Sequence, residues 1–234
     1  MPDVMIAPGL PAYLAVPEGE GPWPAVVVVF EATGPTADMR EQADRFAANG
    51  YLAVLPDFYG GAPWLRCVRS AMRQMMARKG PIFDHIEGAR TWLAGRDDCT
   101  GRVGLIGFCM GGGFALVAAA RYGFQAASVN YGILPRGDLA EVLDGACPIV
   151  AAYGGLDRSL RGAAGRIERA LDELGVPHDV KEYPGAGHSF LTGSRLPAPL
   201  GAVSKIVLGH GKGRENAADG WERIFAFFGE HVPD

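Results

Sequence analysis

The chain has 234 residues, of which 48% are hydrophobic and 21% are charged, and this balance excludes an intrinsically disordered protein. The net charge of -4 argues against a nucleic-acid-binding protein, because such proteins usually carry a basic face. The length suits one α/β domain without repeats, and we expect a single domain over residues 1–234.

The predicted elements alternate between strands and helices along the chain. Alternating hydrophobicity predicts an antiparallel edge strand at Ala12–Val16 and a late strand at His178–Tyr183. Apolar runs, typical of parallel strands buried on both faces, predict Ala25–Phe30, Leu52–Leu55, Arg102–Ile106, Ala127–Tyr131 and Ile149–Tyr153. Helical spacing predicts Asp38–Asn49, Leu65–Arg78, Asp84–Ala94, Met110–Arg121, Ser159–Leu174 and Glu215–Phe228. This order predicts a mostly parallel sheet with helices on both faces, and Thr192–Arg214, which has no clear period, is expected to be a long loop.

The absence of two kinds of sequence signal bears on the cellular compartment of the protein. The N-terminal residues lack the basic start and apolar run of a secretory leader, and no apolar stretch of the sequence is long enough to span a bilayer. The four cysteines, Cys67, Cys99, Cys109 and Cys147, form no C-x-x-C pair, which argues against a zinc ribbon or a thioredoxin motif. We therefore expect a cytoplasmic protein with free thiols and no membrane partner.

The sharpest chemical signal is Gly107-Phe108-Cys109-Met110-Gly111, which follows a predicted buried strand and opens a glycine-rich helix. It is the G-x-S-x-G pattern with cysteine as the nucleophile, in the strand–turn–helix context that this pattern requires. A helix N-terminus favours a thiolate, and the Met110 N–H is placed to donate to an oxyanion. A buried structural cysteine at a tight turn is the alternative interpretation.

Two downstream residues complete a candidate triad. Asp157 follows the strand that ends at Tyr153, and His188 follows the strand that ends at Tyr183. Open α/β sheets place their sites at these strand ends, and the order nucleophile, acid, histidine is that of the α/β-hydrolase fold. His188 would transfer protons and Asp157 would hold its tautomer. Taken singly, Asp157 could be a helix cap and His188 an ordinary turn residue.

Glu31 is the next candidate, because it follows directly on the apolar run that ends at Phe30. A carboxylate there needs a partner, since burial of an unpaired charge is costly. It could contact the thiol, or it could be a loop residue or a partner of Arg40. The Ala32 N–H is then the expected second oxyanion donor.

The chain resembles the dienelactone hydrolases, cysteine-nucleophile members of the α/β-hydrolase fold, from about Ala25 to Phe190. The resemblance rests on five motifs, Val29-Phe30-Glu31, Ala53-Val54-Leu55-Pro56-Asp57-Phe58-Tyr59-Gly60, Gly107-Phe108-Cys109-Met110-Gly111-Gly112, Tyr153-Gly154-Gly155-Leu156-Asp157 and Gly187-His188-Ser189-Phe190. It implies that Cys109 is the nucleophile, His188 the base, Asp157 its orienting acid, and Glu31 a contact of the thiol that helps form the thiolate. The implied reaction is hydrolysis of a carboxylate-bearing enol lactone to maleylacetate in the breakdown of chlorocatechols.

The substrate-binding residues of the family are carried over less completely. The family archetype has an arginine four residues after the histidine, whereas this chain has Thr192 there and its nearest arginine is Arg195. A second family arginine lies in the helix after Tyr59, where Arg66 or Arg69 could take its place or could belong to a solvated helix face. The resemblance therefore assigns the catalytic roles to residues of this chain, but it does not identify the substrate.

Other titratable and apolar residues suggest no further site. The remaining histidines, His85, His178, His210 and His231, show no metal-ligand spacing, and we expect neither a metal nor a cofactor. An apolar patch near the expected pocket comprises Trp64, Leu65, Met72, Met75 and Met76. It is either core packing or the lining of an apolar substrate site.

The sequence thus predicts a hydrolase of enol lactones or activated esters, with a small-molecule ester or lactone as its partner. One alternative is a broad carboxylesterase or thioesterase that uses the same triad, which Thr192 in place of arginine favours. The other is a non-catalytic sensor that uses Cys109 as a reactive thiol, against which a complete triad argues. The sequence leaves open whether the chain is a monomer or a homodimer.

Overall fold

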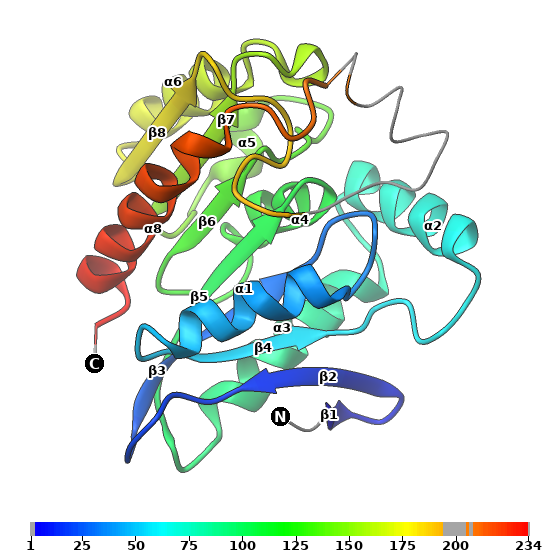
Figure 1. The fold of residues 1–234 in the computed structure, drawn as a ribbon, viewed down its shortest axis with the longest axis vertical. Helices are drawn as coiled ribbons and strands as arrows, with labels where there is room; N and C mark the ends of the chain where they lie inside the picture. Colours follow the sequence, from blue (N-terminus) through cyan, green and yellow to red (C-terminus); the bar gives the residue numbers. More distant parts are fainter. Residues whose placement is uncertain (1–2, 194–204, 206–207, 234) are drawn as a thin grey trace.

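The computed structural model describes residues 3–193, 205 and 208–233, and its centre is an eight-stranded sheet (Figure 1). The strands in spatial order are β1 (Asp3–Ala7), β2 (Leu10–Ala15), β4 (Leu52–Pro56), β3 (Trp23–Val29), β5 (Cys99–Phe108), β6 (Ala127–Asn130), β7 (Ile149–Gly154) and β8 (His178–Tyr183). Strands β3 to β8 run parallel to one another, whereas β2 pairs antiparallel with β4 and with β1. The mostly parallel α/β fold expected from the sequence is therefore confirmed.

Helices cover both faces of this sheet. α1 (Ala37–Ala47) and α8 (Ala217–His231) lie on one face, in front of the strands in Figure 1, and the Phe46 ring packs there against Trp221 and Phe228. The other face carries α3 (Pro81–Ala94), α4 (Met110–Ala118), α5 (Leu139–Leu143) and α6 (Ala163–Leu174). α2 (Trp64–Ala77) packs against α3 and α4.

The central strands consist of residues that suit burial on both faces. In β3, Val26, Val27 and Val28 are fully buried, because helices from both layers cover the strand. A β-branched side chain packs well on a pleated surface, which explains why this run forms a strand although its hydrophobicity does not alternate. The register pairs Val29 with Gly107, so β3 and β5 end at the same edge of the sheet.

Several boundaries differ from the sequence prediction. The helix predicted at Ser159–Leu174 is broken, because Gly162 has φ 72° and separates a 3-10 turn at Arg158–Leu160 from α6. The helix predicted to reach Arg121 ends at Ala118. The strand predicted at Ala12–Val16 lies at Leu10–Ala15, and it is not at the edge of the sheet, because the unpredicted strand β1 pairs outside it.

The predicted loop Thr192–Arg214 lies largely outside the described residues. Its described end contains the stretch 208–213 and a 3-10 turn, η2 (Arg214–Asn216). Within the described part of the chain, no helix is both long enough and apolar enough to cross a lipid bilayer.

Candidate active site

Cys109 lies in a strained turn between β5 and α4. Its backbone has φ 54° and ψ -117°, a conformation that residues with a side chain rarely adopt. Its N–H donates to the Asn130 carbonyl at 3.0 Å, and its own carbonyl accepts from Gly113 at 3.2 Å. These bonds hold the strained residue at the carboxyl edge of the sheet, at the start of a helix.

The two glycines that flank Cys109 are required by close backbone contacts. A Cβ on Gly107 would lie 2.1 Å from the Gly111 carbonyl oxygen, and a Cβ on Gly111 would lie 2.3 Å from the Val29 carbonyl oxygen. No side chain can stand at these distances, so the turn forms only when both positions are glycine.

We expect Gly107→Ala to destabilise the protein by at least about 3 kcal/mol and to reduce thiol labelling of Cys109, because the turn must open to admit the methyl group. Urea unfolding measures the change in the free energy of unfolding. Gly88→Ala is the matched control, since that helical position has open space around it and alanine there should stabilise α3 by about 0.5–1 kcal/mol. Equal stability of the two variants would contradict the close contact at Gly107.

His188 and Asp157 meet in the loops that follow β8 and β7. The His188 Nδ1 atom lies 2.5 Å from the Asp157 Oδ2 atom, and Asp157 is only 1% exposed. The other carboxylate oxygen accepts from the N–H of Ser159 at 3.0 Å and from its hydroxyl at 2.7 Å. Both oxygens of Asp157 are thus satisfied, so the carboxylate can orient the imidazole with Nδ1 as the donor and Nε2 free to face the site.

The electrostatics of the triad couple His188 to the thiol. Burial lowers the pKa of His188, but the Cys109 sulfur and the Asp157 carboxylate outweigh this and raise the pKa well above its ordinary value. Burial raises the pKa of Asp157, but hydrogen bonds from His188 and Ser159 outweigh it, so this pKa lies below its ordinary value. The arrangement favours the protonated form of His188, which lies between the Cys109 sulfur and the Asp157 carboxylate.

Two backbone N–H groups are available for an oxyanion. Among the described residues, neither the Met110 N–H nor the Ala32 N–H donates a hydrogen bond to the protein. The Glu31 carbonyl accepts from Gly34 at 3.0 Å, which fixes the peptide plane and directs the Ala32 N–H to the opposite side.

Two aromatic residues that sequence reasoning missed hold this loop in place. The Tyr59 hydroxyl donates to the Ala32 carbonyl at 3.1 Å, and the Trp64 indole N–H donates to the same oxygen at 2.8 Å. In the sequence Tyr59 stands within a family motif and Trp64 within an apolar patch, and neither pattern reveals a hydrogen bond across the molecule.

Glu31 is buried among hydroxyl groups. Its Oε1 atom accepts from Thr192 at 2.8 Å, from Ser189 at 3.1 Å and from Tyr131 at 3.4 Å. Among the described residues no hydrogen bond joins Glu31 to Cys109, and three hydroxyl groups donate to the Glu31 carboxylate, so the contact expected with the thiol stays a prediction. Tyr131 also packs its ring 5.1 Å from that of His188, which links the Glu31 cluster to the triad.

Of the predicted substrate-binding residues, Arg66 and Arg69 lie together on α2, whereas Thr192 lies in the Glu31 cluster. Thr192 is 2% exposed and donates its hydroxyl hydrogen bond to Glu31, whereas Arg66 and Arg69 are exposed along α2. Arg195 lies outside the described residues. Within the described residues, no group of three metal-ligating side chains is arranged to hold an ion.

Comparisons with known proteins indicate one family. Residues 10–232 match the family model described as "Dienelactone hydrolase family". A Yersinia pestis protein provisionally named as a carboxymethylenebutenolidase is 29% identical over 95% of this chain and 84% of its own length. A carboxymethylenebutenolidase of Rhodococcus opacus is 25% identical over 94% of this chain and 86% of its own.

The fold is shared with solved structures. A crystal structure from Klebsiella pneumoniae, provisionally named a dienelactone hydrolase, superposes with a TM-score of 0.76 at 24% identity, covering 94% of this chain and 93% of the other. A dienelactone hydrolase-like promiscuous phosphotriesterase, P91, from metagenomic libraries gives a TM-score of 0.76 at 22% identity, covering 95% and 92% of the two chains. At these identities the likeness concerns the fold alone.

Proposed function

The chain belongs to the dienelactone hydrolase family of carboxylic ester hydrolases, and from this premise we propose that it hydrolyses an enol lactone or another activated ester through Cys109, His188 and Asp157. One observation carries the proposal. Asp157, His188 and the sulfur of Cys109 form a coupled series at a strained strand–helix turn, beside two unoccupied N–H donors.

In the first half-reaction the Cys109 thiolate attacks the carbonyl carbon. The Met110 and Ala32 N–H groups stabilise the oxyanion, and removal of one such donor typically costs about 10²–10³ in rate. The tetrahedral intermediate collapses, the carbon–oxygen bond of the leaving group breaks, and that oxygen takes a proton from the His188 imidazolium. The products of this step are the free alcohol or enol and a thioester on Cys109.

In the second half-reaction the thioester is hydrolysed. Once Cys109 is acylated, its negative charge is lost, and with it a principal cause of the raised pKa of His188. The imidazole, which has given its proton to the leaving group, therefore stays neutral and can take a proton from water, which attacks the thioester carbon. The carbon–sulfur bond breaks, the acid is released and the thiolate–imidazolium pair is restored.

The role of Glu31 as a partner of the thiol stays a prediction. Its hydroxyl partners support a role in holding the turn at Ser189–Thr192, which follows directly on His188. A movement of the carboxylate toward Cys109 on substrate binding would have to exchange these three hydrogen bonds for others.

The proposal predicts a strong preference for esters over amides. A thiolate is a good leaving group, so an intermediate with a poor amine leaving group collapses back to the substrate. We expect kcat/KM for p-nitrophenyl acetate to exceed that for p-nitroacetanilide by at least about 100-fold, which corresponds to about 2.7 kcal/mol in barrier height. Comparable turnover of the two would contradict the proposed reaction class.

A second candidate is a broad carboxylesterase or thioesterase. The observation in its favour is that Thr192, buried against Glu31, presents a hydroxyl and no cation where a substrate carboxylate would be bound. Comparison of a neutral lactone with its carboxylate-bearing analogue separates the two candidates. A preference for the carboxylate supports the lactonase, and equal rates support the broader enzyme.

A further inference from the structure

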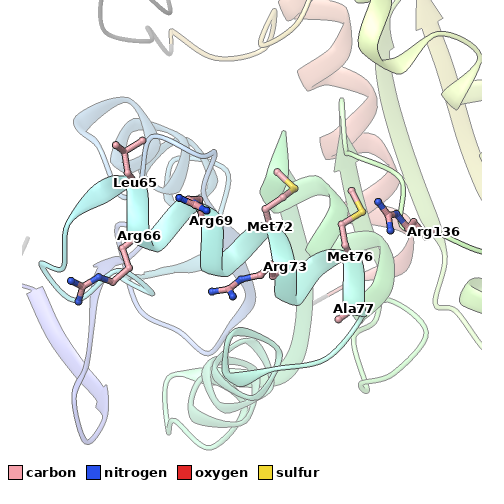
Figure 2. Close-up of a pocket in the computed structure, with 8 residues that line it drawn as sticks. All are labelled: Leu65, Arg66, Arg69, Met72, Arg73, Met76, Ala77 and Arg136. Carbon is pink, nitrogen blue, oxygen red and sulfur yellow. The ribbon is translucent and has the colours of Figure 1, made fainter.

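A groove of about 930 Å³ runs along α2 (Figure 2). Its lining comes from α2 and from Arg136, in the loop that follows β6. Cys109, His188 and Asp157 are not among its described lining residues, so it is distinct from the catalytic turn. Its volume lies in the range of pockets that enclose a whole small-molecule ligand.

The groove is positively charged. Four exposed arginines line it, Arg66, Arg69, Arg73 and Arg136, and none forms an ion pair with a described carboxylate. The sequence of residues 194–207 contains no Asp or Glu that could neutralise them. Since the chain as a whole carries a net charge of -4, this concentration of guanidinium groups is local. Arginine forks bind phosphate oxygens in pairs, so the groove suits a ligand with several phosphate oxygens.

An apolar strip accompanies the arginines. Leu65, Met72 and Met76 line the same groove, and Leu65 is 65% exposed, so the three side chains form a contiguous apolar strip beside the arginines. In Figure 2 these three side chains project from the same side of α2 as Arg69. The apolar patch expected from the sequence is therefore divided, because Met75 is buried in the core whereas its neighbours line the groove. Flexible methionines suit an aliphatic ligand of irregular shape.

The two segments that line the groove each continue along the chain to a residue beside the candidate site. At the N-terminal end of α2, Trp64 is bonded to the carbonyl of Ala32, next to the proposed oxyanion donor. The loop that carries Arg136 begins at Tyr131, whose ring contacts His188. The leaving group of a substrate lies beside His188, which protonates it. A long leaving group can therefore extend from there along the groove, away from the site.

Building on the proposed function, we infer that the groove binds the leaving group of the substrate, and that this group is an aliphatic arm ending in two or more phosphate groups. The substrate is a thioester of such a thiol, which is an activated ester. In the acylation step the bond between the carbonyl carbon and the arm breaks, and the arm leaves with the proton of His188. The acyl group stays on Cys109 until water releases it.

Two thioesters with the same scissile bond test this inference. Acetyl-pantetheine and acetyl coenzyme A share the acetyl group and the thiol arm, and only the second carries phosphates. We expect the KM of acetyl coenzyme A to be about tenfold lower, and the double variant Arg73→Gln/Arg136→Gln to reduce this ratio to about twofold. Arg102→Gln, an exposed arginine at the start of β5, is the matched control and should leave the ratio unchanged.

Two outcomes would overturn the inference. One is a wild-type ratio near one, and the other is an equal fall in the ratio for Arg102→Gln, which would indicate a general charge effect. An increase in ionic strength from about 0.05 M to about 0.5 M should also reduce the wild-type ratio, because exposed charges are screened. Circular dichroism of the variants confirms that they are folded.

Binding separates this inference from the proposed function. Calorimetry with inorganic pyrophosphate requires no turnover, and we expect the double variant to bind it about tenfold more weakly than the Arg102→Gln control. Pyrophosphate binding at the groove without ester hydrolysis would reject the proposed reaction and leave the anion site standing. Hydrolysis of p-nitrophenyl acetate without pyrophosphate binding would reject the groove alone.

Discussion

Replacement of His188 by alanine is expected to reduce the turnover of an activated ester by at least about 10³-fold, because both half-reactions need the imidazole. Labelling of Cys109 by a thiol reagent should persist in part, since the sulfur and its backbone position remain. Intact-protein mass spectrometry after brief exposure to the ester should show an acyl adduct on Cys109 that accumulates, because no base activates water to remove it.

His178→Ala is the matched control for this variant. His178 stands at the opposite end of β8, where its Nε2 atom lies 3.6 Å from the Asp172 carboxylate, so it belongs to a second histidine–aspartate pair outside the site. Wild-type turnover in His178→Ala together with a large loss in His188→Ala supports the triad. Unchanged turnover in His188→Ala would refute it, and would favour the alternative in which Cys109 serves only as a reactive thiol.

The fold was predictable because its strongest signals are local. A β-branched run such as Val26–Val29 can satisfy its burial only in a central strand, and Gly107 and Gly111 meet a backbone requirement that no other residue meets. The positions of Cys109, Asp157 and His188 then follow from the parallel order, since each stands just beyond the carboxyl end of a strand. Topology alone brings the three into one region of the molecule.

The fine structure of the site was not predictable, because it depends on contacts between distant segments. Glu31 is bonded by hydroxyls that lie 100, 158 and 161 residues further along the chain. No periodicity marks such a cluster, because each hydroxyl residue in isolation resembles an ordinary turn or core residue. The same holds for Trp64, which the sequence assigned to an apolar patch and which instead bonds the Ala32 carbonyl.

The four-arginine groove could not be predicted from the sequence for a different reason. In the sequence Arg66, Arg69 and Arg73 appear as one face of an amphipathic helix, for which solvation is a sufficient explanation. Arg136 lies 63 residues beyond Arg73 on another loop, and only the fold places it on the same groove. A cluster of like charges without acidic partners costs free energy through repulsion, which makes it a candidate for ligand binding once it is seen in three dimensions.

The largest effect on pH dependence is expected from Asp157→Asn. The amide removes the negative charge and can donate to Nδ1, which would fix the wrong tautomer of His188, and a change of this kind lowers kcat by about 10³–10⁴. Because Asp157 is among the groups that raise the pKa of His188, that pKa should fall in the variant. The alkaline limb of the acylation rate, where the imidazolium proton that the leaving group takes is lost, should therefore move to lower pH.

The stability of this variant follows from the same two shifts. The lowered pKa of Asp157 contributes stability above the unfolded value of about 3.9, and the raised pKa of His188 contributes stability below the unfolded value of about 6.5. Both contributions are present together between the two unfolded pKa values. The free energy of unfolding that Asp157→Asn loses should therefore be greatest at about pH 4–6.5, and the loss should be smaller at higher and at lower pH. Asp172→Asn, in the exposed pair with His178, is the control and should show no such maximum. A pH-independent loss would mean that Asp157 acts only as the cap of the turn at Arg158–Leu160, and that the charge coupling on which the proposed mechanism depends is absent.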